Sequence, residues 1–225
     1  MEVTKLQCID IGPSVYREAL ERQRELVRRV QEHPSEAYAI FTEHDPPVLT
    51  LGRRTKDENV VAPPEMLRRM GVDVVRIARG GDVTWHGPGQ LVVYPILRVQ
   101  TIRRPVHAYV ASLQEAIAVT LASYGIEAFP REGFPGVWTD AGKIASIGVA
   151  VDRRVAWHGL ALNVAPDMKG FDLIVPCGLP AVKMTSIGEL VDPAPGMPEV
   201  ASRLARELAD RLGFDEVVFE VGTAP

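Results

Sequence analysis

The stretch "GKIASIGVAVDRRVAWHGLALNV", residues 142–164, decides the fold class. It holds two apolar runs of strand length on either side of a polar break, and the dipeptide Asp152-Arg153 in that break predicts a hairpin. Two strands that follow each other without an intervening helix do not fit a fold in which strands and helices strictly alternate. We therefore expect this hairpin to lie in a mixed sheet.

The segments around the hairpin should extend the sheet and cover it with helices. Apolar runs predict strands at residues 4–12, 37–44, 47–52, 72–79 and 90–97. Helices are expected at residues 13–31, 63–70, 106–124 and 199–212. Together they predict an α/β fold of the α+β type, a mixed β-sheet with packed helices. Residues 1–225 should form a single domain, with residues 190–225 as a candidate small C-terminal appendage.

Composition and charge narrow the classes of function. The chain has 225 residues and a net charge of −4, which argues against non-specific nucleic-acid binding. The N-terminus lacks the pattern of a secretory signal, and no run approaches the roughly 20 apolar residues of a membrane span. With two cysteines, we expect a cytoplasmic protein with reduced thiols rather than a Cys8–Cys177 disulfide.

Cys177 lies in "FDLIVPCGLP", residues 171–180, between a proline and a glycine. Pro176 donates no backbone hydrogen bond and Gly178 tolerates turn conformations, so the thiol is expected in a loop where a substrate can reach it. A free thiol has a pKa of about 8.5 and needs a nearby cation or base to become a thiolate at neutral pH. The alternative is a loop cysteine with no role.

His86, His158 and Lys143 are the candidate partners of this thiol. The residues around Cys177 lack the local signature of a papain-type cysteine, which would favour a histidine. Lys143 is one of only five lysines and falls in phase with the apolar positions 145, 147, 149 and 151 of its strand. The alternative is a lysine at a strand end that extends to water. An ammonium about 4 Å from the sulfur would be worth up to ~4 kcal/mol, or about three pKa units.

A glycine-rich segment, "ARGGDVTWHGPGQL" at residues 78–91, is expected to form a loop over residues 80–89 that approaches a ligand. It does not match the dinucleotide fingerprint, and "GVWTDAGKI" from Gly136 is only a near miss to a phosphate loop. The histidines show no metal-binding spacing, so we expect no metal. Small residues at 146, 148, 159 and 161 could leave room for a slender apolar chain or serve close backbone packing against a helix.

Four ordered blocks, "RGGDVTWHGPGQ", "GKIASIG", "HGLALNV" and "PCG", together resemble the octanoyltransferase family. The resemblance covers most of residues 40–190 and implies a fold like the catalytic domains of biotin and lipoate protein ligases. It implies that Cys177 takes the acyl chain and that Lys143 is the general acid/base. It also implies that three segments line the acyl-substrate site: Arg79, Gly80, Gly81, Asp82, Val83, Thr84, Trp85 and His86; Ser146, Ile147 and Gly148; and Gly159, Leu160 and Ala161.

The partners that this resemblance implies are octanoyl-acyl carrier protein as donor and lipoyl domains as acceptors. The acceptors would belong to 2-oxoacid dehydrogenase complexes and to the glycine cleavage H protein. No cofactor would be needed, because amide formation from a thioester is downhill. Two other functions stay open: an ATP-dependent lipoate or biotin protein ligase, and a non-enzymatic module that binds lipoyl domains. Because the partner domains are typically acidic, we also expect at least one of five Arg-Arg pairs to rim the cleft at Cys177.

Overall fold

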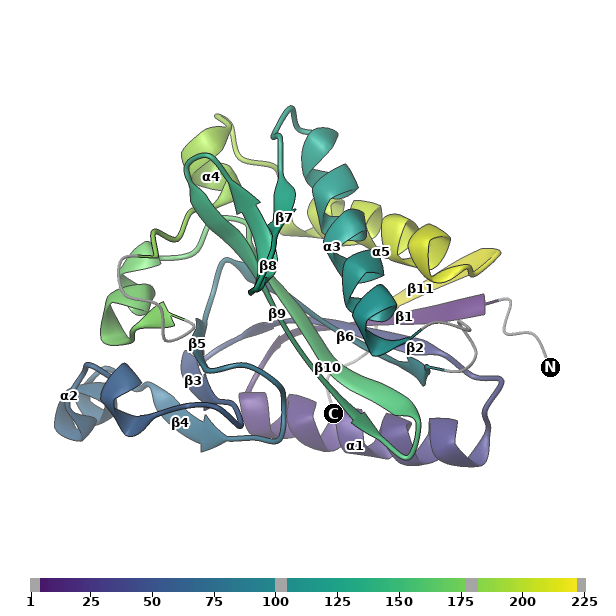
Figure 1. Ribbon diagram of the computed structural model, residues 1–225, viewed down its shortest axis with the longest axis horizontal. Coiled ribbons are helices and arrows are strands. Elements are labelled where there is room, and N and C mark those ends of the chain that lie inside the picture. The colour runs from purple at the N-terminus through teal and green to yellow at the C-terminus, as the bar shows by residue number, and fades with distance from the viewer. Residues whose placement is uncertain (1–4, 100–104, 177–181, 222–225) are drawn as a thin grey trace.

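The computed structural model describes residues 5–99, 105–176 and 182–221. Its main feature is an eight-stranded sheet in the order β11-β1-β2-β6-β10-β9-β8-β7 (Figure 1). The strands are β1 (Lys5–Ser14), β2 (Tyr38–His44), β6 (Gln90–Arg98), β7 (Phe129–Arg131), β8 (Phe134–Thr139), β9 (Gly142–Asp152), β10 (Val155–Asn163) and β11 (Glu216–Val221). β1 pairs in parallel with β2 and β11, and the remaining pairs are antiparallel. The predicted mixed sheet is confirmed.

Helices cover both faces of this sheet. α3 (Val106–Ala122) and α5 (Met197–Leu212) lie on one face, and α1 (Tyr16–Glu32) lies on the other (Figure 1). Successive residues of β6 point to opposite faces of the sheet. Val93 packs in the core under α3 and α5, whereas Val92 packs in the core under α1. This alternation is the two-residue period of a strand that is buried on both sides.

A second, three-stranded sheet lies beside the first, in the order β4 (Asp73–Arg76), β3 (Val48–Leu51), β5 (Val83–His86). The expectation of a loop throughout residues 80–89 is wrong, because residues 83–86 form β5 and pair with β3 from Val48↔His86 to Leu51↔Val83. Glycines before and after this short strand hid it from the sequence pattern. Four short helices complete the described chain: η1 (Asp57–Asn59), α2 (Pro64–Arg69), η2 (Met168–Leu173) and α4 (Ile187–Leu190).

Two predicted boundaries are corrected by pairing between strands. The helix expected from residue 13 begins at Tyr16, because Pro13 and Ser14 still pair with β2. The hairpin turn falls at Arg153-Arg154 rather than at Asp152-Arg153, since Asp152 pairs with Val155. Both arginines have positive φ angles, 44° and 74°, as tight hairpin turns that match the strand twist require. The strands β7, β8 and β11 were not expected.

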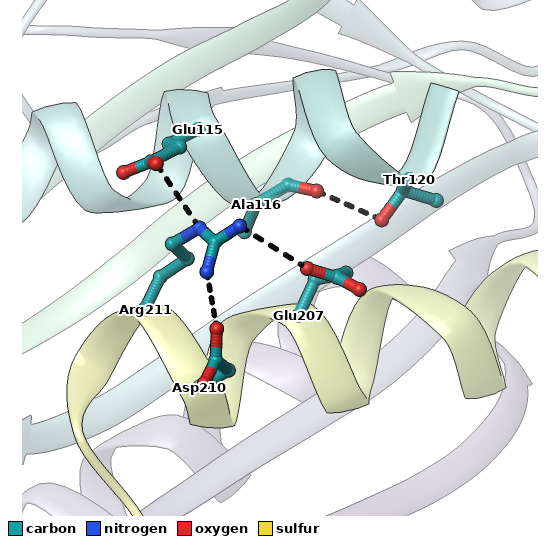
Figure 2. A network of polar contacts seen from close by, with 6 residues as sticks. All are labelled: Glu115, Ala116, Thr120, Glu207, Asp210 and Arg211. Carbon is teal, nitrogen blue, oxygen red and sulfur yellow. Dashed lines mark hydrogen bonds and ion pairs between the residues drawn. The ribbon is translucent and has the colours of Figure 1, made fainter. Parts of the chain in front are cut away.

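The C-terminal residues contribute to the main sheet and core. β11 pairs with β1, and α5 packs against α3 with Leu204 and Leu208 fully buried. Figure 2 shows polar contacts between these two helices: Arg211 of α5 forms ion pairs with Glu115 of α3 at 3.2 Å, with Glu207 at 3.8 Å and with Asp210. Among the described residues, no helix is long and apolar enough to cross a membrane.

Candidate active site

A cavity of about 400 Å³ opens between the large sheet and the small one. The structure brings Lys143 and twelve of the predicted substrate residues together around it: Arg79, Gly81, Asp82, Val83, Thr84, His86, Ser146, Ile147, Gly148, Gly159, Leu160 and Ala161. Cys177 lies outside the described residues. Segments that are distant in the chain thus line one hollow of a size typical of small-molecule sites.

Two predicted residues, Gly80 and Trp85, do not line this cavity. The N–H of Gly80 donates to the carbonyl of Val149 at 2.9 Å, which ties the loop to β9. Trp85 lies in a separate apolar cluster, where its ring meets Phe171 edge-on at 5.2 Å. Successive residues of a strand point to opposite faces, so Thr84 and His86 line the cavity while Trp85 between them packs in the core.

A bulge in β9 directs Lys143 toward the cavity. Val137 pairs with Ala145 and Trp138 pairs with Lys143, so Ile144 is one extra residue in β9. Ile144 and Ala145 both pack in the core under α3 and α5. The phase assigned to Lys143 from the sequence, in register with residues 145, 147 and 149, is therefore wrong, because the bulge reverses the alternation between 143 and 145.

Lys143 is 1% exposed, so it is not a strand-end lysine that extends to water. Its Nζ lies 5.6 Å from the centre of the Trp138 ring, within range of a cation–π contact. The side chain passes over Gly136, whose φ of +132° favours glycine; a Cβ there would lie 2.5 Å from Cε of Lys143. Gly136 thus provides the space that the lysine occupies.

The backbone of Lys143 also anchors the chain beyond residues 177–181. Its N–H donates to the carbonyl of Lys183 at 2.8 Å, and its carbonyl accepts from the N–H of Thr185 at 2.9 Å. On the other side, Val175 donates to the carbonyl of Asn59 at 2.8 Å. The Asn59 side chain in turn donates to Asp82, a cavity residue, at 2.8 Å. Both flanks of residues 177–181 are therefore hydrogen-bonded beside the cavity.

Arg79 holds the glycine-rich loop against the small sheet. Its guanidinium donates to the carbonyl and hydroxyl of Thr50, at 2.7 and 2.9 Å, and to the carbonyl of Gly80 at 3.0 Å. A Cβ on Gly148 would lie 2.8 Å from Cδ of Arg79, and one on Gly159 would lie 2.1 Å from the carbonyl oxygen of Val93. These two glycines are explained by close packing within the protein, but against the Arg79 side chain and strand β6 rather than against the helix that the second interpretation named.

Three neutral histidines lie in or beside the cavity. Burial lowers the pKa of His86 to about 3, of His158 to about 3 and of His44 to about 4, so all three are neutral at pH 7. His86 hydrogen-bonds Gln90 at 2.7 Å, and His44 hydrogen-bonds the Tyr94 hydroxyl at 2.7 Å. Groups with such low basicity are poor general bases at neutral pH.

Several cavity residues were not expected from the sequence. They come from α1, β6, the loops around the small sheet and the β7–β8 hairpin: Tyr16, Arg54, Lys56, Ile77, Val92, Tyr94, Gly133, Phe134 and Pro135. His158, considered only as a partner for the thiol, also lines the cavity with a φ of 56°. That strained backbone at a cavity residue is typical of functional sites. Within the described ranges, no three His, Cys, Asp or Glu side chains gather to hold a metal.

Comparison with known proteins gives the family. Residues 15–209 match the lipoyl protein ligase A/B catalytic domain. The octanoyltransferase of Desulfovibrio desulfuricans is 42% identical over 88% of this chain and 83% of its own length. That of Chloroflexus aggregans is 43% identical over 88% and 90%. This chain belongs to the octanoyltransferase family.

Solved structures agree with this octanoyltransferase fold. A putative lipoate protein ligase from T. acidophilum with bound lipoic acid superposes with a TM-score of 0.79, at 19% identity, over 99% of this chain and 90% of that one. A biotin protein ligase from Aquifex aeolicus superposes with a TM-score of 0.52, at 13% identity, over 94% and 70%. At these identities the likeness concerns the fold, and it confirms the fold expected from the resemblance.

Proposed function

We propose that this octanoyltransferase moves an octanoyl group from the thioester of octanoyl-acyl carrier protein to a lysine of a lipoyl domain, through a thioester on Cys177. The acceptor domains would be those of 2-oxoacid dehydrogenase complexes and of the glycine cleavage H protein. Residues 1–225 would act as one catalytic domain. The chemistry requires a reduced thiol, which a cytoplasmic location provides.

The observation that best supports this proposal is the buried Lys143 on the cavity wall. One of the five lysines of the chain is 1% exposed and lines the cavity of about 400 Å³. Hydrogen bonds hold both flanks of residues 177–181 beside this cavity. A thiol presented from that segment would meet a cation in a water-poor site, where the attraction between thiolate and ammonium is strong.

In the first step, the Cys177 thiolate attacks the carbonyl carbon of the octanoyl thioester. A new carbon–sulfur bond forms to Cys177 and the bond to the carrier sulfur breaks. The Lys143 ammonium gives its proton to the departing carrier thiolate, so that the carrier leaves as a neutral thiol. The enzyme then holds an octanoyl thioester beside a neutral Lys143.

In the second step, neutral Lys143 accepts a proton from the acceptor lysine, which frees that amine to attack the thioester. The amide bond forms, the Cys177 thiolate leaves and the second amine proton passes to solvent. The dyad returns to its starting charges. Because the acyl group is already activated as a thioester, the reaction needs no ATP.

Intact mass spectrometry after incubation with octanoyl-acyl carrier protein tests the proposal. We expect one octanoyl adduct per chain, released by hydroxylamine and lost in Cys177→Ala. Cys8→Ala is the matched control, because Cys8 is the other cysteine and is fully buried in β1. An adduct that persists in Cys177→Ala would contradict the proposal. Transfer that requires free octanoate and ATP would favour the ligase alternative.

A further inference from the structure

A second hollow, of about 380 Å³, lies next to the candidate active site. Three arginines from separate elements line it: Arg24 from α1, Arg53 from the turn after β3 and Arg76 from the end of β4. The other lining residues are Leu20, Ile77, Ala78, Trp157 and His158. No carboxylate is among the described residues that line the hollow. Convergence of three like charges around one hollow is a feature of anion sites.

The ion pairs that Arg24 and Arg76 already form are weak. Arg24 pairs with Glu21 and Arg76 pairs with Asp57 at 3.1 Å, but both carboxylates are largely exposed and lie outside the lining of the hollow. Exposed ion pairs contribute little free energy, so a doubly coordinated anion can displace them. The backbone of Arg53 is held in place by a hydrogen bond, in which its N–H donates to the carbonyl of Arg79 at 3.1 Å.

His158 supplies an independent indication of a ligand. Its side chain is buried, and neither ring nitrogen has a hydrogen-bond partner among the described residues. Burial, followed by the charges of Arg79, Arg24 and Arg53, lowers its pKa to about 3, so the neutral ring offers one N–H donor. Its backbone φ of 56° and its stacking on Trp157 at 4.0 Å hold it in place. A buried donor without a partner costs stability unless a ligand satisfies it.

The second hollow adjoins the active site. Ile77 and His158 line both, so these two side chains form their common wall. A ligand that reaches from one hollow to the other would place an anionic group among the arginines and an uncharged group in the cavity beside Lys143.

We propose that Arg24, Arg53, Arg76 and His158 form a subsite for the phosphate of the pantetheine arm that carries the octanoyl thioester. This inference rests on the proposed function, in which the donor is octanoyl-acyl carrier protein. Acyl carrier proteins hold the acyl chain as a thioester at the end of a phosphopantetheine arm. The phosphodiester is the fixed anion of that arm, and guanidinium groups bind its oxygens with matched, charge-assisted hydrogen bonds. The subsite would orient the thioester toward Cys177 and discriminate donors that carry this phosphate from thioesters that lack it.

The test compares octanoyl-4′-phosphopantetheine with octanoyl-pantetheine, which lacks the phosphate. The readout is the rate of octanoyl adduct formation at sub-saturating donor, followed by intact mass. We expect the wild type to react with the phosphorylated donor about tenfold faster or more, because removing charged hydrogen bonds usually weakens binding by about that factor. The double variant Arg53→Gln/Arg76→Gln should lose most of that preference. Added salt should weaken the preference of the wild type.

Arg206→Gln is the matched control, since Arg206 is an exposed arginine on α5, outside both hollows. It changes the net charge by the same amount per residue and should keep the preference. Equal rates for the two donors in the wild type, or a preference that survives in the double variant, would overturn the subsite. An equal loss of this preference in Arg206→Gln would also overturn the subsite. Absence of an adduct from either donor or from octanoyl-carrier protein would instead contradict the proposed function.

Octanoyl-coenzyme A tests whether the pantetheine arm must be attached to a carrier protein. It carries the same pantetheine phosphate without a carrier protein. We expect octanoyl-carrier protein to react with a higher kcat/KM than octanoyl-coenzyme A, with both donors slowed in the double variant. A lower kcat/KM for the carrier would overturn the assignment of the subsite to carrier-bound donors.

Discussion

Lys143 and Gly136 share one space in which only one side chain fits. A Cβ on Gly136 would lie 2.5 Å from Cε and 3.2 Å from Nζ of Lys143, and 2.4 Å from the carbonyl oxygen of Ala145. The position of Lys143, which precedes the bulge in β9, therefore depends on a glycine in the neighbouring strand β8.

Gly136→Ala should displace the Lys143 side chain and lower octanoyl transfer at least tenfold. The physical reason is overlap between the new methyl group and Cε, in addition to strain at a φ of +132°. The loss of transfer would be measured from transfer rates, and the displacement of Lys143 from the pH dependence of iodoacetamide labelling. Gly125→Ala is the control for strain alone, because its φ is +76° and nothing lies within 4 Å of its Cβ position. Equal transfer rates in the two variants would contradict the relationship.

Lys143→Ala should lower transfer by about 10²–10⁴-fold, the usual effect of removing a general acid/base. If the ammonium stabilises the Cys177 thiolate, the midpoint of iodoacetamide labelling should also move to higher pH. Lys169→Ala removes an exposed lysine and serves as the control. A labelling profile that is the same in Lys143→Ala and the wild type would refute the pairing of lysine and thiol.

Native protein should react with iodoacetamide at one cysteine. Burial raises the pKa of Cys8 to about 12, so Cys8 stays a protonated thiol within the core at neutral pH. Peptide mapping after brief labelling should find the label on Cys177, and on both cysteines once the chain is unfolded in guanidinium chloride. Rapid labelling of Cys8 in the native state would disprove this.

Stability should fall as the pH drops below about 6.5, because His44, His86 and His158 have folded-state pKa values of about 3 to 4. Between those values and about 6.5 the unfolded chain binds protons that the folded chain does not, so acid favours unfolding. The contribution to the slope is up to ~1.4 kcal/mol per pH unit for each histidine. Urea denaturation between pH 7 and 5 measures it.

His158→Asn should make that pH dependence shallower, since asparagine does not titrate and tolerates positive φ. The φ of His158 is 56°, so the substitution keeps the backbone conformation. His33→Asn is the control at an exposed position outside the cavity. If the slope is unaffected by His158→Asn, this histidine is not a buried neutral group.

Arg211→Met should lower the free energy of unfolding by about 1 kcal/mol, because Arg211 joins α5 to Glu115 of α3 and is only partly exposed. Arg203→Met removes a more exposed pair with Glu199 within α5 and should cost less. Guanidinium chloride denaturation compares the two. A larger loss in Arg203→Met would show that the ion pairs in Figure 2 do not stabilise the helix packing.

Local signals predicted most of the elements. The last helix was expected to end before Gly213, and it does so with Gly213 in the left-handed conformation at a φ of 82°. The hairpin of β9 and β10 was expected from two adjacent apolar runs. Such features depend on neighbouring residues, whose preferences for helix, strand or turn act within a few positions.

Local sequence patterns did not predict the strands that form by pairing with distant segments. β5 is a four-residue strand between glycines, and it forms because β3 lies beside it. β11 adds to the sheet by pairing in parallel with β1, at the opposite end of the chain. A short strand gains its hydrogen bonds from its partner rather than from its own residues, so its own sequence carries a weak signal.

The sequence by itself determined the mixed fold, the family and three of the segments that line the cavity, because motifs and apolar periods are local properties of the chain. Only the tertiary structure decided which way Lys143 points and which arginines meet. A bulge in β9 reversed the side of the sheet that Lys143 faces. The meeting of Arg24, Arg53 and Arg76 around one hollow depends on how α1 packs against the small sheet. Both are consequences of long-range packing, in which one inserted residue or one helix position changes what each side chain faces.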